Sequence, residues 1–95
     1  MINHEKIALM TSRLQRAFSP SALQVIDESE QHAGHAGHQG GGRHFAIVIS
    51  AECFNQMTRV AAHRRIYALF ADLMPEEIHA LRIKISPSPI LPPST

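Results

Sequence analysis

Apolar residues recur at helical spacing near the start of the chain. Between about residues 3 and 17 they lie three or four positions apart, with polar residues such as Lys6 between them: Ile7, Met10, Leu14 and Ala17. This spacing predicts an amphipathic helix. Asn3 is a candidate N-cap, and Glu5 would lie in the first turn, where a carboxylate suits the helix dipole. Ser19-Pro20 ends the pattern.

Two short segments with strand-forming residues follow this helix. Residues 23–28 read LQVIDE and residues 44–50 read HFAIVIS, and β-branched and aromatic residues favour strands. The connection between them, about Ser29 to Arg43, holds all five glycines of the chain. A connection of this length in a small domain is usually either functional or mobile.

A second helix is predicted from Thr58, its candidate N-cap, to Met74, where Pro75 stops it. One apolar stripe and its flanking residues would form the buried side of this helix: Val60, Tyr67, Phe70 and Met74, broadened by Ile66, Leu69 and Leu73. His63 falls on or beside the same stripe, where packing is the simplest interpretation. Residues 80–86, ALRIKIS, then alternate apolar and polar positions with the period of a half-buried strand.

These elements follow each other in the order α-β-β-α-β. A strand-helix-strand connection is right-handed, so the last strand should lie parallel to the second. The sequence therefore predicts an α+β domain, within the broad α/β class, with a three-stranded mixed sheet and helices on one face. A chain of 95 residues with 44% hydrophobic residues supports one core. We expect one domain over residues 1–86 and a disordered proline-rich tail over 87–95.

Charge and cysteine content limit the function classes. Lysine and arginine total 9 against 8 acidic residues, so a basic binding surface would have to be a local patch. Cys53 is the only cysteine, which excludes an internal disulfide and suits a reducing compartment. No secretory signal or bilayer-spanning run is apparent, so we expect a cytoplasmic protein without a membrane partner.

The histidines of the long connection are the first candidate chemistry. His32, His35 and His38 lie three residues apart, and imidazole is a common metal ligand. A soluble glycine- and histidine-containing connection explains the same residues. One cysteine cannot supply the thiolates of an iron-sulfur cluster, so a partner would have to bring them. No nucleophile motif is present, and we predict neither an enzyme nor a small-molecule substrate.

A second candidate lies on the helix predicted at 58–74. Arg59, Arg64 and Arg65, with Arg43 from the long connection, would form a basic patch for nucleic-acid phosphates. An ordinary solvated helix face explains these arginines equally well. His79 follows a short predicted turn at the start of the last strand, and periodicity alone leaves open whether it is a cap or a ligand.

Several blocks together resemble the BolA family, in the order that the family has them. They are FSPSALQVIDES, HAGH, HFAIVIS, FNQMTRVAAHRRIYALFADLM and IHAL. The resemblance implies a fold similar to the class II KH domain. It also implies partnership with a monothiol glutaredoxin through a bridged 2Fe-2S cluster, in which glutaredoxin and its glutathione supply the thiolates. Some bacterial members are DNA-binding transcriptional regulators of morphology and stress genes.

The resemblance assigns the cluster ligands of this chain to two histidines. His79 matches the histidine of the IHAL block, and His32 matches the histidine or cysteine of the long loop, with His35 and His38 as alternatives. The family's arginine before the HR pair is Ala62 here, which weakens the DNA-binding expectation. The leading hypothesis is a non-enzymatic cluster adaptor, and the alternative is a DNA-binding regulator.

Overall fold

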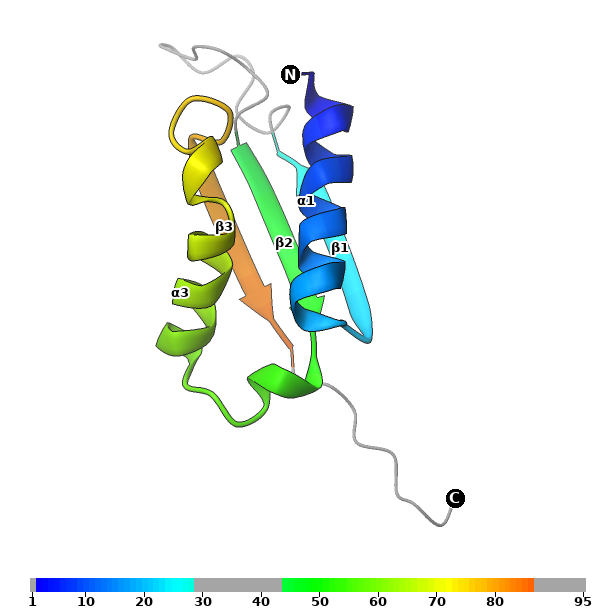
Figure 1. Cartoon of the computed structure of the whole chain (residues 1–95), viewed down its shortest axis with the longest axis vertical. Coiled ribbons are helices and arrows are strands. Elements are labelled where there is room, and N and C mark those ends of the chain that lie inside the picture. The colour runs from blue at the N-terminus through cyan, green and yellow to red at the C-terminus, as the bar shows by residue number, and fades with distance from the viewer. Residues whose placement is uncertain (1, 29–43, 87–95) are drawn as a thin grey trace.

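The computed structural model describes residues 2–28 and 44–86, and these form one layer of sheet and one layer of helix (Figure 1). The elements in chain order are α1 (Asn3–Phe18), β1 (Ala22–Asp27), β2 (His44–Ser50), the 3-10 turn η1 (Glu52–Phe54), α3 (Arg59–Leu69), the 3-10 turn η2 (Ala71–Leu73) and β3 (Ala80–Ile85). The predicted order of helices and strands is confirmed.

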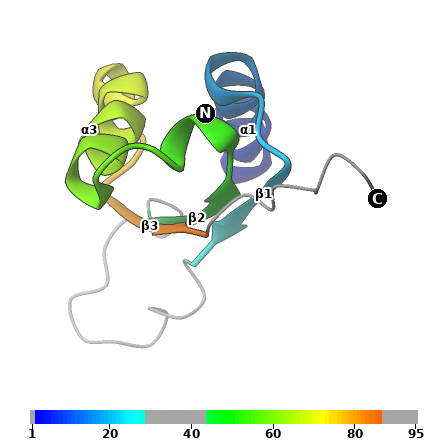
Figure 2. The same ribbon diagram turned by 90° about the horizontal axis from the view of Figure 1, so that it is seen from below.

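The three strands form a mixed sheet in the order β1-β2-β3. β1 runs antiparallel to β2, with Val25 opposite Ile47, and β3 runs parallel to β2, with His44 opposite Ala80. Seen along the sheet, α1 and α3 both cover the same face (Figure 2). The predicted mixed sheet with helices on one face is therefore confirmed.

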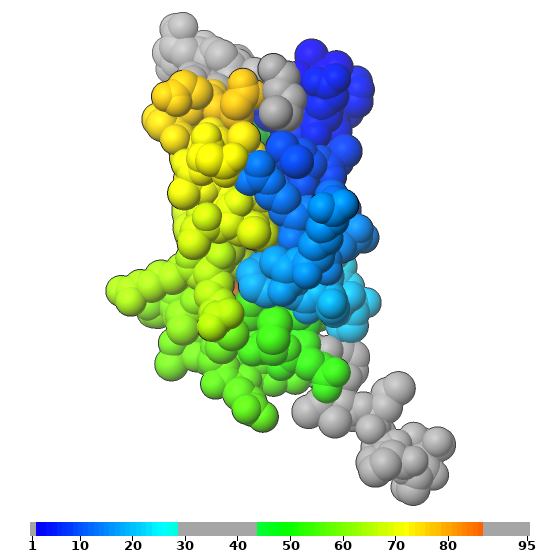
Figure 3. Space-filling model, viewed as in Figure 1, coloured from blue at the N-terminus to red at the C-terminus, as the bar shows by residue number. Residues whose placement is uncertain are grey.

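The core lies between that sheet face and the two helices. Alternate residues of β2 point into it and are essentially fully buried: Phe45, Ile47 and Ile49. They meet Met10 and Leu14 from α1 and a set from the α3 side of the domain, Ala62, Ile66, Phe70 and Leu73. In Figure 3 the side chains of α1 and α3 lie side by side over the sheet.

The start of α1 differs from the prediction at Asn3 and at Lys6. Ile2 is the N-cap, while Asn3 is the first helical residue and donates from Nδ2 to Asp27 Oδ2 at 2.7 Å. Glu5 lies in the first turn as predicted and accepts from the backbone N–H of Ile2. Lys6, expected on the polar side, is only 5% exposed, and its ammonium lies 3.5 Å from Glu77 Oε2 and 6.0 Å from the ring centroid of Phe45.

The second helix is shorter than predicted, and it buries only part of the predicted stripe, including Ile66 and Phe70. Thr58 is the N-cap, with its hydroxyl accepting from Ala61 N–H, but α3 ends at Leu69 instead of Met74. Phe70 leaves helical dihedrals at φ −117° and ψ 12°, and the chain tightens into η2. Val60 and Tyr67, predicted to be in the core, are 60% and 40% exposed. The small Ala62 faces the sheet in their place and allows the helix to pack closely.

An ion pair joins the two helical segments on the outside. The Arg13 guanidinium donates to both carboxylate oxygens of Asp72, at 2.7 and 3.0 Å, and to the Leu69 carbonyl at 2.9 Å. The hydrogen bonds from Arg13 lower the pKa of the Asp72 carboxyl, and the same pairing raises the pKa of Arg13. The pair fixes η2 against α1.

Some of the predicted features lie outside the described residues. They are His32, His35, His38, Arg43 and the tail over 87–95. Within residues 2–28 and 44–86, no helix has the length and apolar character needed to cross a membrane.

Candidate metal-ligand site

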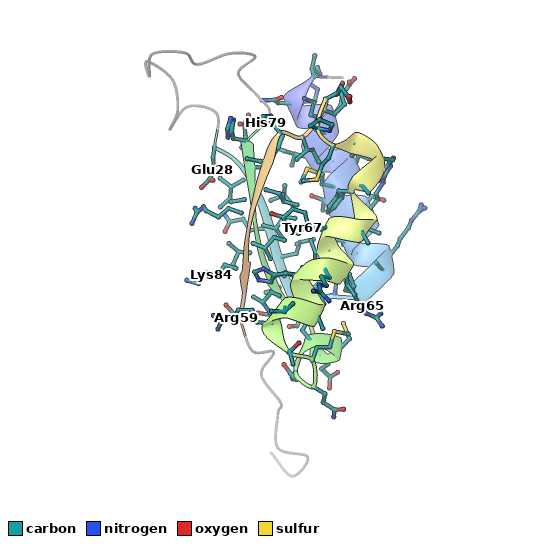
Figure 4. All side chains as sticks on the ribbon, turned by 90° about the vertical axis from the view of Figure 1, so that its left-hand side faces the viewer. Glu28, Arg59, Arg65, Tyr67, His79 and Lys84 are labelled. Atoms are coloured by element: carbon teal, nitrogen blue, oxygen red, sulfur yellow. The ribbon has the colours of Figure 1, made fainter. Side chains whose placement is uncertain are left out.

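His79 lies at the end of the sheet where β2 and β3 both begin, and it is exposed. The turn before it is fixed by two hydrogen bonds, in which the backbone N–H groups of Glu77 and Ile78 both donate to the Leu73 carbonyl at 2.9 Å. Ile78 is fully buried, and β3 starts at Ala80. The backbone of His79 is therefore held on both sides, and its imidazole faces solvent (Figure 4).

A second imidazole lies beside it. His44, the first residue of β2, has its ring centroid 5.6 Å from that of His79, with the two ring planes at 53°. Sequence reasoning did not assign His44 any role. The sequence contained the information needed, because parallel strands place their first residues at the same edge of a sheet. His44 is the first residue of β2, and His79 directly precedes the first residue of β3.

The buried side of this sheet end is charged as well as apolar. Lys6 lies 6.0 Å from the ring centroid of Phe45, the residue after His44. Its ammonium approaches Glu77, two residues before His79. α1 thus supports the turn that carries His79 through an ion pair as well as through packing.

The opposite, uncovered face of the sheet also carries an ion pair near this end. Arg82 donates from Nε to Glu28 Oε1 at 3.2 Å and from a terminal nitrogen to Oε2. This pairing raises the pKa of Arg82. The backbone N–H of Glu28 donates to the His44 carbonyl at 2.9 Å, so the residue that follows β1 is bonded to the first residue of β2.

The cysteine is far from the two histidines. Cys53 lies in η1, which follows the C-terminal end of β2, whereas His44 and His79 lie at the other end of the strands (Figure 1). Cys53 is exposed. Among the described residues, no group of three or more His, Cys, Asp or Glu side chains is arranged to hold a metal ion.

The exposed stripe of α3 lines a shallow hollow of about 730 Å³. Val60, His63, Arg64 and Tyr67 contribute to its wall, and the Tyr67 hydroxyl donates to the Leu81 carbonyl of β3 at 2.6 Å. His63 is half-buried there. It thus lies on the outward apolar stripe, on the side away from the core.

The three described arginines of the predicted basic patch are all exposed but lie on different sides of α3. Arg64 lines the outer hollow, Arg65 lies by Ala17 and Phe18 of α1, and Arg59 lies by Ile85. Figure 4 shows Arg59 and Arg65 on opposite sides of the helix. Successive helical residues turn by about 100°, so positions 59, 64 and 65 are spread around the axis. A single flat surface therefore cannot contact all three arginines.

A family model described as "BolA-like protein" matches residues 14–88. The chain belongs to the BolA family. The Arabidopsis thaliana protein "BOLA1, chloroplastic" is 38% identical over 88 residues, which cover 90% of this chain and 54% of that protein. The chain thus spans about half the length of this BolA relative.

A solved BolA domain and a bacterial BolA relative are also similar to this chain. The BolA domain of SufE1 from Arabidopsis thaliana superposes with a TM-score of 0.75 at 33% identity, covering 86% of this chain and 91% of that domain. "DNA-binding transcriptional regulator BolA" of Escherichia coli strain K12 is 34% identical over 71 residues, covering 75% of this chain and 65% of that protein. The BolA match includes both His44 and His79, since both lie within residues 14–88.

Proposed function

We propose that this BolA-family chain is a non-enzymatic adaptor that binds a monothiol glutaredoxin and co-ligates a 2Fe-2S cluster, for delivery or sensing in iron homeostasis. The observation that carries the proposal is His79, an exposed imidazole on a turn fixed by the buried Ile78 and by two hydrogen bonds to the Leu73 carbonyl. A ligand held in this way does not have to be ordered when the metal binds.

The described histidines fit such a cluster in type. Imidazoles replace two thiolates on one iron in Rieske-type centres, and His79 and His44 lie at one end of the sheet. Cys53, the chain's only cysteine, lies at the other end. The thiolates would therefore come from glutaredoxin and its glutathione. When bound, the cluster would supply electron transfer or an iron-sulfur unit for transfer, and this chain would hold one iron and position the partner.

The second imidazole predicted from the sequence is a loop histidine. His32, with His35 and His38 as alternatives, lies outside the described residues, and its assignment stays a prediction.

The first test uses the complex with a monothiol glutaredoxin, purified together under anaerobic conditions with glutathione. We expect a visible absorption and circular dichroism spectrum that differs from that of the glutaredoxin cluster alone. His79→Ala should change this spectrum and make the cluster more labile to chelators, because one iron loses its fixed ligand. Binding between the two proteins should persist.

His63→Ala is the matched control, because it removes an imidazole from the outer stripe of α3, away from the sheet end. It should leave the spectrum and the chelator lability unchanged. A parent complex that never contains a cluster would contradict the proposal.

A second candidate function is DNA binding, which is favoured by the name of the Escherichia coli relative and by the exposed arginines of α3. If Arg64 and Arg65 contact phosphates, the double variant Arg64→Ala, Arg65→Ala should weaken binding to unrelated duplexes alike. It should also reduce the slope of log affinity against log salt by about 1–2. Fluorescence anisotropy at several salt concentrations measures both quantities.

Lys84→Ala provides the control for this experiment, since Lys84 is an exposed cation on the uncovered sheet face. An unchanged affinity and salt slope in the double arginine variant would remove α3 as the DNA-contacting element.

A further inference from the structure

The two edges of the described sheet differ in how they are protected. β3 forms one edge, where the Tyr67 hydroxyl donates to the Leu81 carbonyl and where Arg82 and Lys84 are exposed. β1 forms the other edge, on the side of α1 (Figure 2). It reads ALQVID, with no lysine, arginine or proline and with one acidic residue, at its end. Charges and prolines on edge strands prevent pairing between sheets, so β1 is the less protected edge.

The backbone groups that β1 directs away from β2 belong to alternate residues. In this antiparallel pair the N–H of Glu28 donates to the His44 carbonyl, and Ile26 lies opposite Ala46. The hydrogen bonds to β2 therefore fall on the even-numbered residues of β1, because successive residues of a strand bond to opposite sides. The N–H and C=O groups of Leu23 and Val25 point to the outer side, where no described strand pairs with β1.

The sequence of β1 is complementary to itself in one antiparallel register. With a two-fold axis at Gln24, Leu23 of one copy lies opposite Val25 of the other, and Ala22 lies opposite Ile26, so both kinds of pair are apolar. Each pair of Leu23 with Val25 would exchange two N–H···O bonds, from the groups that point outward in the single chain. A register centred on Val25 would instead set the Asp27 carboxylate opposite Leu23.

We propose that β1 is a homodimer interface, at which it pairs antiparallel with β1 of a second copy about a two-fold axis at Gln24. The two sheets join into one, with the helices of both copies on the same face. Association stops at the dimer, because each remaining edge is the protected β3. The copies run in opposite directions, so the two sheet ends that carry His79 lie at opposite ends of the dimer. The inference is independent of the proposed function.

The first experiment measures association by sedimentation velocity. An interface of one strand from each copy is small, so the sedimentation coefficient should rise as the protein concentration increases from about 10 µM to about 1 mM. Gln24→Lys should abolish this rise, because two ammonium groups would face each other at the axis. Gln24 is exposed, so the fold should persist. Gln56→Lys makes the same change at an exposed position between η1 and α3, and it should retain the rise.

A charge exchange tests the register. Gln24→Glu should also be monomeric by itself, because two carboxylates would face each other. Mixing Gln24→Glu with Gln24→Lys should restore a dimer, since the axis then joins opposite charges. A parent protein without any rise, or a rise retained in Gln24→Lys, would overturn the inference. A mixture that stays monomeric would overturn the pairing about Gln24.

The second experiment follows amide hydrogen exchange by NMR. The N–H groups of Leu23 and Val25 should exchange rapidly in dilute parent protein and more slowly as its concentration rises. Those of Gln24 and Ile26, which bond to β2, should be protected at every concentration, and their protection in Gln24→Lys verifies that this variant is folded. Slow exchange of Leu23 and Val25 that does not depend on concentration would mean that another part of the same chain covers this edge, and it would overturn the inference.

Discussion

Lys6 shows how one residue supports the candidate site from the buried side. Its side chain is 7% exposed, and its ammonium lies 3.5 Å from the Glu77 carboxylate. Long aliphatic stems let lysine occupy apolar surroundings while the charged end finds a partner. Because Glu77 is two residues before His79, this contact also restrains the turn that presents the imidazole.

This arrangement predicts different effects for two substitutions of Lys6. Lys6→Ala removes both the stem and the charge beside Glu77, and should lower the free energy of unfolding by about 1–3 kcal/mol. Lys6→Met retains most of the stem and should cost less. Urea denaturation measures both.

In each Lys6 variant the NMR signals of His79 should report a looser turn, more so in the alanine variant. Equal stability of the parent and Lys6→Ala would show that the buried contact contributes nothing.

At the scale of single elements, α3 carries two apolar stripes on one short helix. The outer stripe, with Val60 and Tyr67, is spaced like a buried face, and the sequence analysis wrongly placed these two residues in the core, while Ile66, Phe70 and Leu73 are buried as predicted. The inner one contains Ala62, Ile66 and Phe70. Apolar periodicity identifies a helix, but it cannot rank two stripes whose burial is decided by how closely the sheet approaches.

The end of α3 was unpredictable for a related reason. Pro75 marks where a helix must have stopped, so the prediction extended to Met74. The helix ends five residues earlier, at Leu69, because Phe70 and Leu73 both reach the core through the tighter η2 turn. Helix propensity depends on the local sequence and therefore gives no information about this packing of Phe70 and Leu73 into the core. The strands, whose alternation depends on one buried sheet face, were predicted to within one residue.

The candidate site was also predicted only in part from the sequence. His79 was identified through family resemblance, and the structure places it on an exposed, fixed turn. The closeness of His44 to His79 was missed, because it depends on the register between β2 and β3 and not on any motif. Arg59, Arg64 and Arg65 lie at the surface as expected, but the adjacency of Arg64 and Arg65 in the sequence concealed that they point to different sides of the helix.

At the scale of the whole molecule, the Arg13–Asp72 pair predicts how stability depends on pH. The pKa of Asp72 is lowered in the folded state, chiefly by hydrogen bonds from Arg13. Its contribution to stability is therefore present above the ordinary carboxyl pKa of 3.8, and it is lost as pH falls below that value through the folded pKa. The pair joins α1 to η2, so this loss should loosen the helical layer.

Asp72→Asn should accordingly destabilise the protein at about pH 7 and have much less effect at about pH 2, where the parent carboxylate is also neutral. Thermal unfolding at several pH values measures the difference. Glu76→Gln is a suitable control, as it removes an exposed carboxylate from the following turn. A constant difference between parent and Asp72→Asn across this range would contradict the assigned role of the ion pair.

The hydrogen bond from Tyr67 to the Leu81 carbonyl has a consequence for association between copies of this protein. β3 is an edge strand of the described sheet, and exposed strand edges are templates for aggregation. Tyr67 occupies an acceptor on that edge, and the exposed Arg82 and Lys84 would bring like charges together if two such edges paired antiparallel. The Tyr67 hydrogen bond and the charges of β3 therefore disfavour edge-to-edge pairing through β3 between copies of this domain.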